Sequence, residues 1–165
     1  MTMDGILVEQ LLLNELRSRG MTFAAAESCT GGLIAKRITD LSGASAVFRG
    51  GVVSYTNDVK RDVLGVPQTL LDEFGAVSAP VARAMAEGVR RITGADLAVS
   101  VTGVAGPDRD DRGNEVGTVY LALAAPDGTH SFLFRFDGDR AAIRQQAADT
   151  AFALLRQYLN ENATN

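Results

Sequence analysis

Apolar side chains recur at helical spacing in three long stretches of the chain. The first, Ile6 to Leu16, is followed by Gly20, a residue type that commonly closes helices. The second, Pro80 to Ile92, has proline in its first turn and Gly94 just past its end. The third runs from about Asp139 to Asn160. Shorter helices are predicted over Gly31 to Thr39, Asn57 to Leu64 with Asn57 as N-cap, and Pro67 to Phe74.

Short apolar runs between these helices predict strands. Val47 to Tyr55 is rich in β-branched residues, and Leu97 to Val101 has the near-continuous apolar character of a strand buried on both faces. Pro126 to Thr129 contains Asp-Gly between two alternating runs, which predicts a hairpin. The remaining strands are predicted over Thr22 to Ala26, Thr118 to Ala124 and His130 to Phe136.

The alternation of strands and helices predicts a single α/β domain over residues 1–165, a three-layer α/β/α sandwich. The hairpin reverses one strand, so the sheet is expected to be mixed but mostly parallel. Ligands of such open sheets bind beyond the carboxyl ends of the strands. That rule directs attention to three loops, at residues 27–32, 55–60 and 102–117.

Composition narrows the classes of partner. The net charge is −4 without a Lys/Arg-rich stripe, so no nucleic-acid partner is expected. No apolar run approaches the length of about 20 residues that a membrane helix needs, so no membrane association is expected. The segment Met1 to Gly5 lacks the basic start and apolar stretch of a signal peptide. A single cysteine excludes an internal disulfide, and a cytoplasmic location is expected.

The loop from Glu27 to Gly32 leaves a strand and opens a helix. Unpaired amides and the helix dipole favour an anion or a developing oxyanion there, and Ser28 would be a nucleophile. The alternative is a plain helix start with Thr30 as N-cap. Cys29 is a second possible nucleophile, but such a cysteine usually needs a histidine, and His130 lies just after the hairpin turn. A packed thiol is the simpler interpretation.

Lys60 lies in the first turn of a predicted helix, where the dipole disfavours its ammonium form. A neutral lysine can act as a general base, and serine–lysine pairs are a known alternative to serine–histidine pairs. Tyr55 is in a position to relay a proton or to orient the lysine. The alternative is a solvated lysine beside a half-buried tyrosine.

The third loop begins Thr102-Gly103-Val104-Ala105-Gly106-Pro107 after the most buried strand. Its glycines allow backbone amides to surround a phosphate or an oxyanion, although a simple turn also uses glycine. The acidic residues that follow, Asp108, Asp110 and Asp111, favour an exposed turn over a divalent-cation site. Two arginines at the start of the last helix, Arg140 and Arg144, suit a phosphate by their bidentate geometry or serve as surface charges.

These motifs resemble the CinA C-terminal domain family, the nicotinamide-nucleotide amidases, from about Val8 to Tyr158. The Glu-Ser-Cys-Thr-Gly-Gly string and the paired glycines Gly50 and Gly51 are highly specific. Because no additional N-terminal domain precedes the motifs here, the stand-alone form is expected. The matching segments are Ala26 to Ala35, Phe48 to Asn57 with Lys60, Leu64 to Val66, Gly94 to Asp96, Thr102 to Pro107, Val116 to Tyr120 and Phe136 to Arg140.

The resemblance implies hydrolysis of nicotinamide mononucleotide to nicotinate mononucleotide and ammonia, without metal or cofactor. By matching position it implies that Ser28 is the nucleophile, Lys60 the base and Tyr55 the assisting group. It also implies a small-molecule pyridine nucleotide as partner, and a homo-oligomer is expected of small α/β enzymes. The expected substrate-binding residues are Thr30, Gly31, Gly32, Thr102, Gly103, Gly106 and Arg140.

The sequence departs from the family after Pro107, where a glycine-rich stretch followed by Lys-Pro is usual and Asp108 to Glu115 stands instead. Added acids weaken the attraction for an anionic phosphate. A second departure is Ala79-Pro80, where acidic residues are usual in the family, and it changes only where a helix starts. Two other functions therefore stay open: a nucleotide-binding domain without amidase activity, and a competence- or damage-related protein that binds a recombinase.

Overall fold

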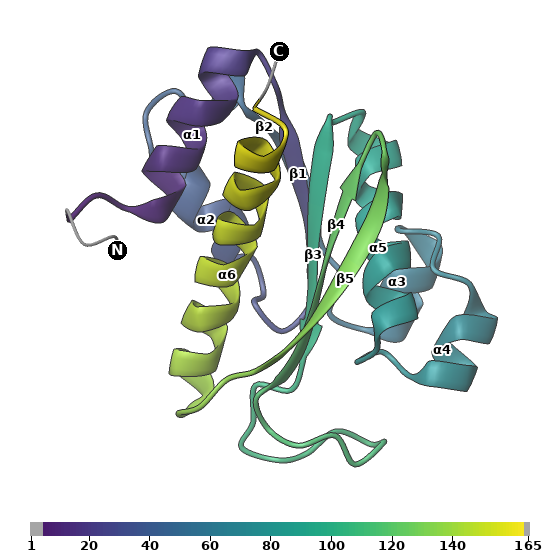
Figure 1. The fold of residues 1–165 in the computed structure, drawn as a ribbon. Helices are drawn as coiled ribbons and strands as arrows, with labels where there is room; N and C mark the ends of the chain where they lie inside the picture. Colours follow the sequence, from purple (N-terminus) through teal and green to yellow (C-terminus); the bar gives the residue numbers. More distant parts are fainter. Residues whose placement is uncertain (1–4, 164–165) are drawn as a thin grey trace.

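The computed structural model describes residues 5–163, in which a central sheet is covered by helices on both faces (Figure 1). The strands are β1 (Phe23–Glu27), β2 (Phe48–Val53), β3 (Leu97–Gly103), β4 (Thr118–Ala125) and β5 (Gly128–Arg135). Apart from Gly5, the N-terminal segment that the signal-peptide argument used lies outside the described residues. No helix between residues 5 and 163 is both long and apolar enough to cross a membrane.

The five strands are ordered β2-β1-β3-β4-β5. β1 pairs in parallel with both β2 and β3, whereas β4 is antiparallel to β3 and β5. Only β4 therefore runs against the others, and the predicted three-layer sandwich with a mixed, mostly parallel sheet is confirmed. The hairpin is tighter than predicted, because Gly128 already pairs with Ala125 and only two residues make the turn.

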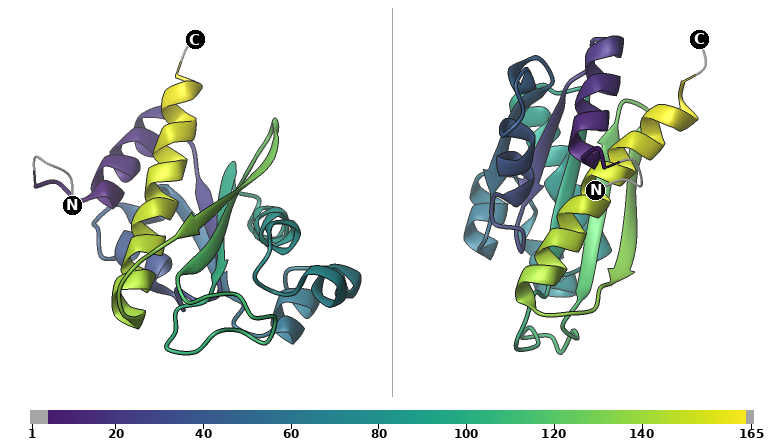
Figure 2. Two further views of the ribbon diagram at one scale, coloured as in Figure 1. Left: turned by 60° about the horizontal axis from the view of Figure 1, so that its bottom comes forward. Right: turned by 90° about the vertical axis from the view of Figure 1, so that its left-hand side faces the viewer.

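The helices α1 and α6 lie on one face of the sheet, with α2 beside them, and α5 covers the other face with α3 and α4 at its end (Figures 1 and 2). α1 and α5 end at the predicted glycines, Gly20 and Gly94, both in the left-handed conformation. Their bounds are α1 (Val8–Arg19), α2 (Leu33–Thr39), the short 3-10 helix η1 (Ala44–Ala46), α3 (Asn57–Asp62), α4 (Gln68–Phe74), α5 (Ala79–Thr93) and α6 (Arg140–Glu161).

The two faces of the sheet bury side chains of different size. Along β3, Leu97, Val99 and Val101 pack in the cluster under α1, α2 and α6, whereas Ala98 packs toward α5. Small residues let α5 approach the sheet closely, and the Ser100 hydroxyl donates to the Ala82 carbonyl at 2.6 Å. The apolar contact area on both faces supplies the main driving force for folding.

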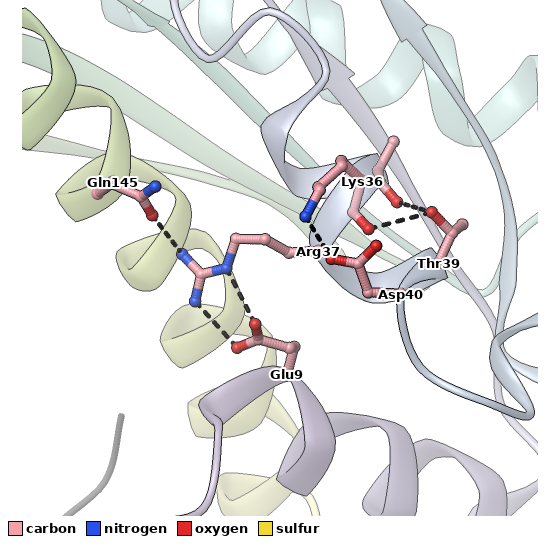
Figure 3. A network of polar contacts seen from close by, with 7 residues as sticks. Glu9, Lys36, Arg37, Thr39, Asp40 and Gln145 are labelled. Carbon is pink, nitrogen blue, oxygen red and sulfur yellow. Dashed lines mark hydrogen bonds and ion pairs between the residues drawn. The ribbon is translucent and has the colours of Figure 1, made fainter.

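A buried ion pair links the three helices on the first face. Both carboxylate oxygens of Glu9 on α1 accept hydrogen bonds from Arg37 on α2, at 3.0 and 2.9 Å, and Figure 3 shows Arg37 reaching Gln145 on α6 as well. The guanidinium also lies over the Phe152 ring at 5.1 Å. Burial alone would raise the pKa of Glu9, but the contacts with Arg37 outweigh burial and lower it. α2 is thereby fixed against its neighbours.

Candidate active site

A cavity of about 240 Å³ lies at the carboxyl ends of the central strands, as predicted. It is formed by the segments that follow β1, β2 and β3, the link between α4 and α5, and the start of α6. The carboxyl ends of these strands lie at the lower end of the sheet in Figure 1. Of the residues predicted to bind or act, the cavity brings together Ser28, Tyr55, Lys60, Thr102, Gly103, Gly106 and Arg140. The other lining residues are Cys29, Asn57, Ala76, Val77, Val104, Ala105, Asp108 and Asp110.

Ser28 and Lys60 form a hydrogen-bonded pair in this cavity. The Lys60 Nζ lies 2.9 Å from the Ser28 Oγ and 2.6 Å from the carbonyl oxygen of Ser54. Ser54 is itself held at the end of β2, since its backbone N–H donates to the Glu27 carbonyl at 2.7 Å. The Ser54 carbonyl therefore accepts a hydrogen bond from the lysine and holds the Lys60 Nζ beside the Ser28 Oγ. The alternative of a solvated lysine is wrong.

Burial lowers the pKa of Lys60 from 10.5 to about 8. The side chain is 1% exposed, and none of the ion pairs among residues 5–163 includes it. A lysine with this pKa is neutral in roughly a tenth of the molecules at pH 7. It can therefore accept a proton from a neighbouring hydroxyl, which is the property that a general base needs.

The start of α2 is capped by the residue that precedes the serine. The Glu27 carboxylate is 1% exposed and accepts hydrogen bonds from the amides of Ile34, at 2.9 Å, and Ala35, at 3.1 Å. The protein's own carboxylate thus occupies the anion position that the sequence assigned to a ligand. The interpretation of Thr30 as N-cap is wrong, because the residue preceding α2 is Gly32 and Glu27 supplies the cap.

Three of the predicted substrate-binding residues do not line the cavity. Thr30 is fully buried, and its hydroxyl has no hydrogen-bond partner among residues 5–163. Gly31 and Gly32 form the turn into α2, both with positive φ. These residues shape the segment that carries Ser28, and that segment lines the cavity with Ser28 and Cys29 alone.

Arg144 does not line the cavity and holds the segment after the serine instead. Its guanidinium donates to the carbonyl oxygens of Cys29, at 3.1 Å, and Thr30, at 2.9 Å. Cys29 belongs to this segment and is 6% exposed, and burial raises the pKa of its thiol to about 12. His130 lies on β5 and lines a different hollow. A buried thiol whose pKa is raised is a poor nucleophile, and Lys60 makes its hydrogen bond with Ser28, which favours Ser28.

Tyr55 contacts Arg140, and no hydrogen bond among the described residues joins it to Lys60. The Arg140 guanidinium donates to the Tyr55 hydroxyl at 2.9 Å and to the Gly106 carbonyl. Arg140 thus bridges two walls of the cavity, and neither of its partners carries a charge. The tyrosine is 55% exposed, so its hydroxyl is accessible to a ligand at the mouth of the cavity.

The third predicted loop begins later than expected, because β3 extends through Gly103. Thr102 is therefore a strand residue, whose hydroxyl donates to the Ala76 carbonyl at 2.8 Å and fixes another part of the cavity wall. A Cβ at Gly103 would lie 2.8 Å from the Thr118 carbonyl oxygen, so glycine is needed there. The amides of Ala105 and Gly106 donate to no acceptor among residues 5–163. Two consecutive free amides in a cavity wall can hold an oxyanion.

Sequence reasoning missed Asn57 as a cavity residue by assigning it to the helix cap. The N-cap of α3 is Thr56, whose hydroxyl accepts from the Val59 amide at 3.4 Å. The Asn57 carboxamide lines the cavity three residues before Lys60 and has no hydrogen-bond partner among the described residues. The sequence did contain a signal for this arrangement: Thr56 is also a strong capping residue, and a cap at Thr56 leaves the Asn57 side chain free.

The acidic loop after Pro107 reaches the cavity with Asp108 and Asp110. The Asp110 carboxylate accepts hydrogen bonds from the amides of Arg112 and Asn114 and from the Asn114 side chain. The Arg112 guanidinium in turn donates to carbonyl oxygens at the end of α4. Within residues 5–163, no three acidic, histidine or cysteine side chains are grouped as a metal site would require. The loop is an ordered turn that contributes negative charge to the cavity.

Fold and site together define an α/β-sandwich domain with a buried serine–lysine pair at the carboxyl ends of its strands. A sequence model of one family, the CinA C-terminal domain, matches residues 7–159. The chain therefore belongs to the CinA C-terminal domain family, and the resemblance that the motifs carry is confirmed.

Relatives and solved structures agree with this assignment. A CinA-like protein from Geobacter sulfurreducens is 57% identical over 143 residues, which cover 87% of this chain and 35% of that protein. The chain thus spans about a third of the length of this curated relative. A CinA superfamily protein from Klebsiella pneumoniae has a TM-score of 0.91 at 32% identity, covering 93% of this chain and 96% of that one. The competence/damage-inducible protein CihA from Agrobacterium tumefaciens has a TM-score of 0.87 at 41% identity, covering 91% and 92%.

Proposed function

We propose that this domain is an amidohydrolase that converts nicotinamide mononucleotide to nicotinate mononucleotide and ammonia. The observation that carries the proposal is the 2.9 Å contact between the Ser28 Oγ and the buried Lys60 Nζ. A serine hydroxyl becomes an effective nucleophile only when an adjacent base removes its proton. Lys60 meets this requirement because burial lowers its pKa to about 8.

In the acylation step, the Lys60 amine accepts the Ser28 proton while the serine oxygen attacks the carboxamide carbon. A tetrahedral intermediate forms, and its oxygen carries a negative charge. The lysine then gives the proton to the departing nitrogen, the C–N bond breaks, and ammonia leaves. The product of this step is an ester between Ser28 and the nucleotide's acyl group.

In the deacylation step, a water molecule takes the place that ammonia has left. Lys60 accepts a proton from the water, whose oxygen attacks the ester carbon. The C–O bond to Ser28 breaks, and the lysine returns its proton to the serine. Nicotinate mononucleotide is released, and the enzyme regains its starting protonation state.

The oxyanion of both intermediates needs fixed donors. The amides of Ile34 and Ala35 at the start of α2 are already bonded to Glu27, so they are occupied. The free amides of Ala105 and Gly106 line the same cavity as Ser28. We assign the oxyanion to these two amides, and we assign the substrate phosphate to Arg140, which forms no ion pair with any residue between 5 and 163.

The test is the release of ammonia and the formation of nicotinate mononucleotide by purified wild type, with nucleotide binding measured in parallel by calorimetry. Equal amounts of the two products are expected.

A specific observation favours a second candidate, a domain that binds the nucleotide without hydrolysing it. Asp108 and Asp110 add negative charge to the cavity that Ser28 lines, which disfavours an oxyanion there. Binding without ammonia release would contradict the amidase and support this second candidate.

A further inference from the structure

The cavity carries charges of both signs that do not neutralise one another. Four charged residues line it: Lys60, Asp108, Asp110 and Arg140. None of the four takes part in an ion pair within residues 5–163. Among the described residues, the guanidinium of Arg140 is bonded only to the uncharged Gly106 carbonyl and Tyr55 hydroxyl. Such a cavity is complementary to a ligand that itself carries both charges.

Asp108 is the acidic group that remains free for a ligand. The Asp110 carboxylate is taken up by three N–H donors of its own loop. By contrast, the exposed side chain of Asp108 has neither a hydrogen bond nor an ion pair with any residue between 5 and 163. Apart from Asp108, Asn57 and the buried Cys29 thiol, every polar side chain in the cavity wall has a hydrogen-bond partner.

The cations of the acidic loop are engaged away from Asp108. Arg109 lies 3.5 Å from Glu115, and Arg112 donates to the carbonyl oxygens at the end of α4. The negative charge of Asp108 is therefore not offset by its own loop. A cationic group bound in the cavity would find its counter-charge there.

We propose that Asp108 selects a substrate whose carboxamide is borne on a cationic ring, and that the cavity takes zwitterionic pyridinium carboxamides in preference to uncharged ones. This inference rests on the proposed function for the identity of the reacting group. It goes further in assigning opposite ends of one ligand to opposite charges of the cavity. The pyridinium ring pairs with Asp108, and the phosphate pairs with Arg140.

Two ligands that differ only in ring charge test this selection. Nicotinamide mononucleotide has a cationic ring, whereas its 1,4-dihydro form has the same phosphate and carboxamide on an uncharged ring. Their Kd values are measured by calorimetry at low salt on Ser28→Ala, on Ser28→Ala with Asp108→Asn, and on Ser28→Ala with Asp111→Asn. The last variant is the matched control, because Asp111 belongs to the same loop but does not line the cavity.

We expect Asp108→Asn to raise the Kd of the cationic nucleotide about three- to fivefold, as for an exposed charge pair, and to leave that of the dihydro form unchanged. Asp111→Asn should change neither. The proposal is overturned if Asp108→Asn lowers either Kd, because Asp108 would then face the phosphate. Equal effects of the two substitutions, no effect of Asp108→Asn, or no binding of the cationic nucleotide would also overturn it. Since these are binding measurements, failure of hydrolysis in wild type contradicts the proposed function separately.

Discussion

Replacing Lys60 by methionine should change how the stability of the protein depends on pH. The side chain is 1% exposed, and its pKa falls from 10.5 to about 8 on folding. Between these two values, the unfolded chain binds a proton at this residue that the folded protein does not bind. The free energy of unfolding therefore rises with pH across this window and is flat below pH 8, where both states are protonated.

The size of this effect follows from the pKa difference. Each pKa unit corresponds to about 1.4 kcal/mol, so the Lys60 contribution between pH 8 and pH 10.5 is about 3 kcal/mol. The methionine variant lacks the titrating group. The difference in unfolding free energy, wild type minus Lys60→Met, should therefore increase by about 3 kcal/mol over this range. The methionine variant also lacks the hydrogen bond to the Ser54 carbonyl. This loss lowers the stability of the variant at every pH, so it does not contribute to the increase.

Urea unfolding followed by far-UV circular dichroism at half-unit steps from pH 7 to pH 10.5 measures this difference. The chain has only one other lysine, Lys36, which is exposed and lies 2.6 Å from Asp40. Lys36→Met is therefore the matched control and should not reproduce the increase. If the difference in unfolding free energy stays level or falls with pH, burial does not lower the pKa of the Lys60 amine and the reasoning is refuted.

Three further results are expected. The kcat/KM for ammonia release should rise about tenfold per pH unit below pH 8 and level off above it, because the neutral Lys60 amine is the active form; a profile that falls with pH contradicts this role. Glu27→Gln should lower the free energy of unfolding by about 1–3 kcal/mol in urea titrations, because the α2 amides lose a charged acceptor; an unchanged midpoint contradicts it. Asn57→Ala should raise KM severalfold in initial-rate assays with little loss of thermal stability, because its carboxamide has no hydrogen-bond partner among residues 5–163; an unchanged KM assigns it no substrate contact.

Local patterns predicted the elements well where the determining signal lies within a few residues. The α5 helix begins with proline in its first turn and ends at Gly94, and both signals stand in the sequence itself. The hairpin between β4 and β5 was predicted from Asp-Gly, although the turn itself is shorter. At Asn57 the local signal was ambiguous, because two adjacent residues both favour the N-cap position and only the backbone of α3 decides between them.

Contacts between distant segments could not be predicted in the same way. Glu27 caps α2 across the turn that carries Ser28, and no local pattern marks a strand carboxylate as the cap of the next helix. The contact between Ser28 and Lys60 depends on the parallel pairing of β1 with β2, which brings the two strand ends together. Arg144 illustrates the same limit. Its residue type suits a phosphate, but its position on α6 directs it to two backbone carbonyls.

The central claim is that Ser28 and Lys60 act together as nucleophile and base. It is tested most directly by the initial rate of ammonia release from nicotinamide mononucleotide at pH 8.5, with wild type, Ser28→Ala, Lys60→Met and the control Lys36→Met. We predict release by wild type and by the control, and a loss of at least about a thousandfold in each of the other two variants. Near-normal release by either Ser28→Ala or Lys60→Met would contradict the account.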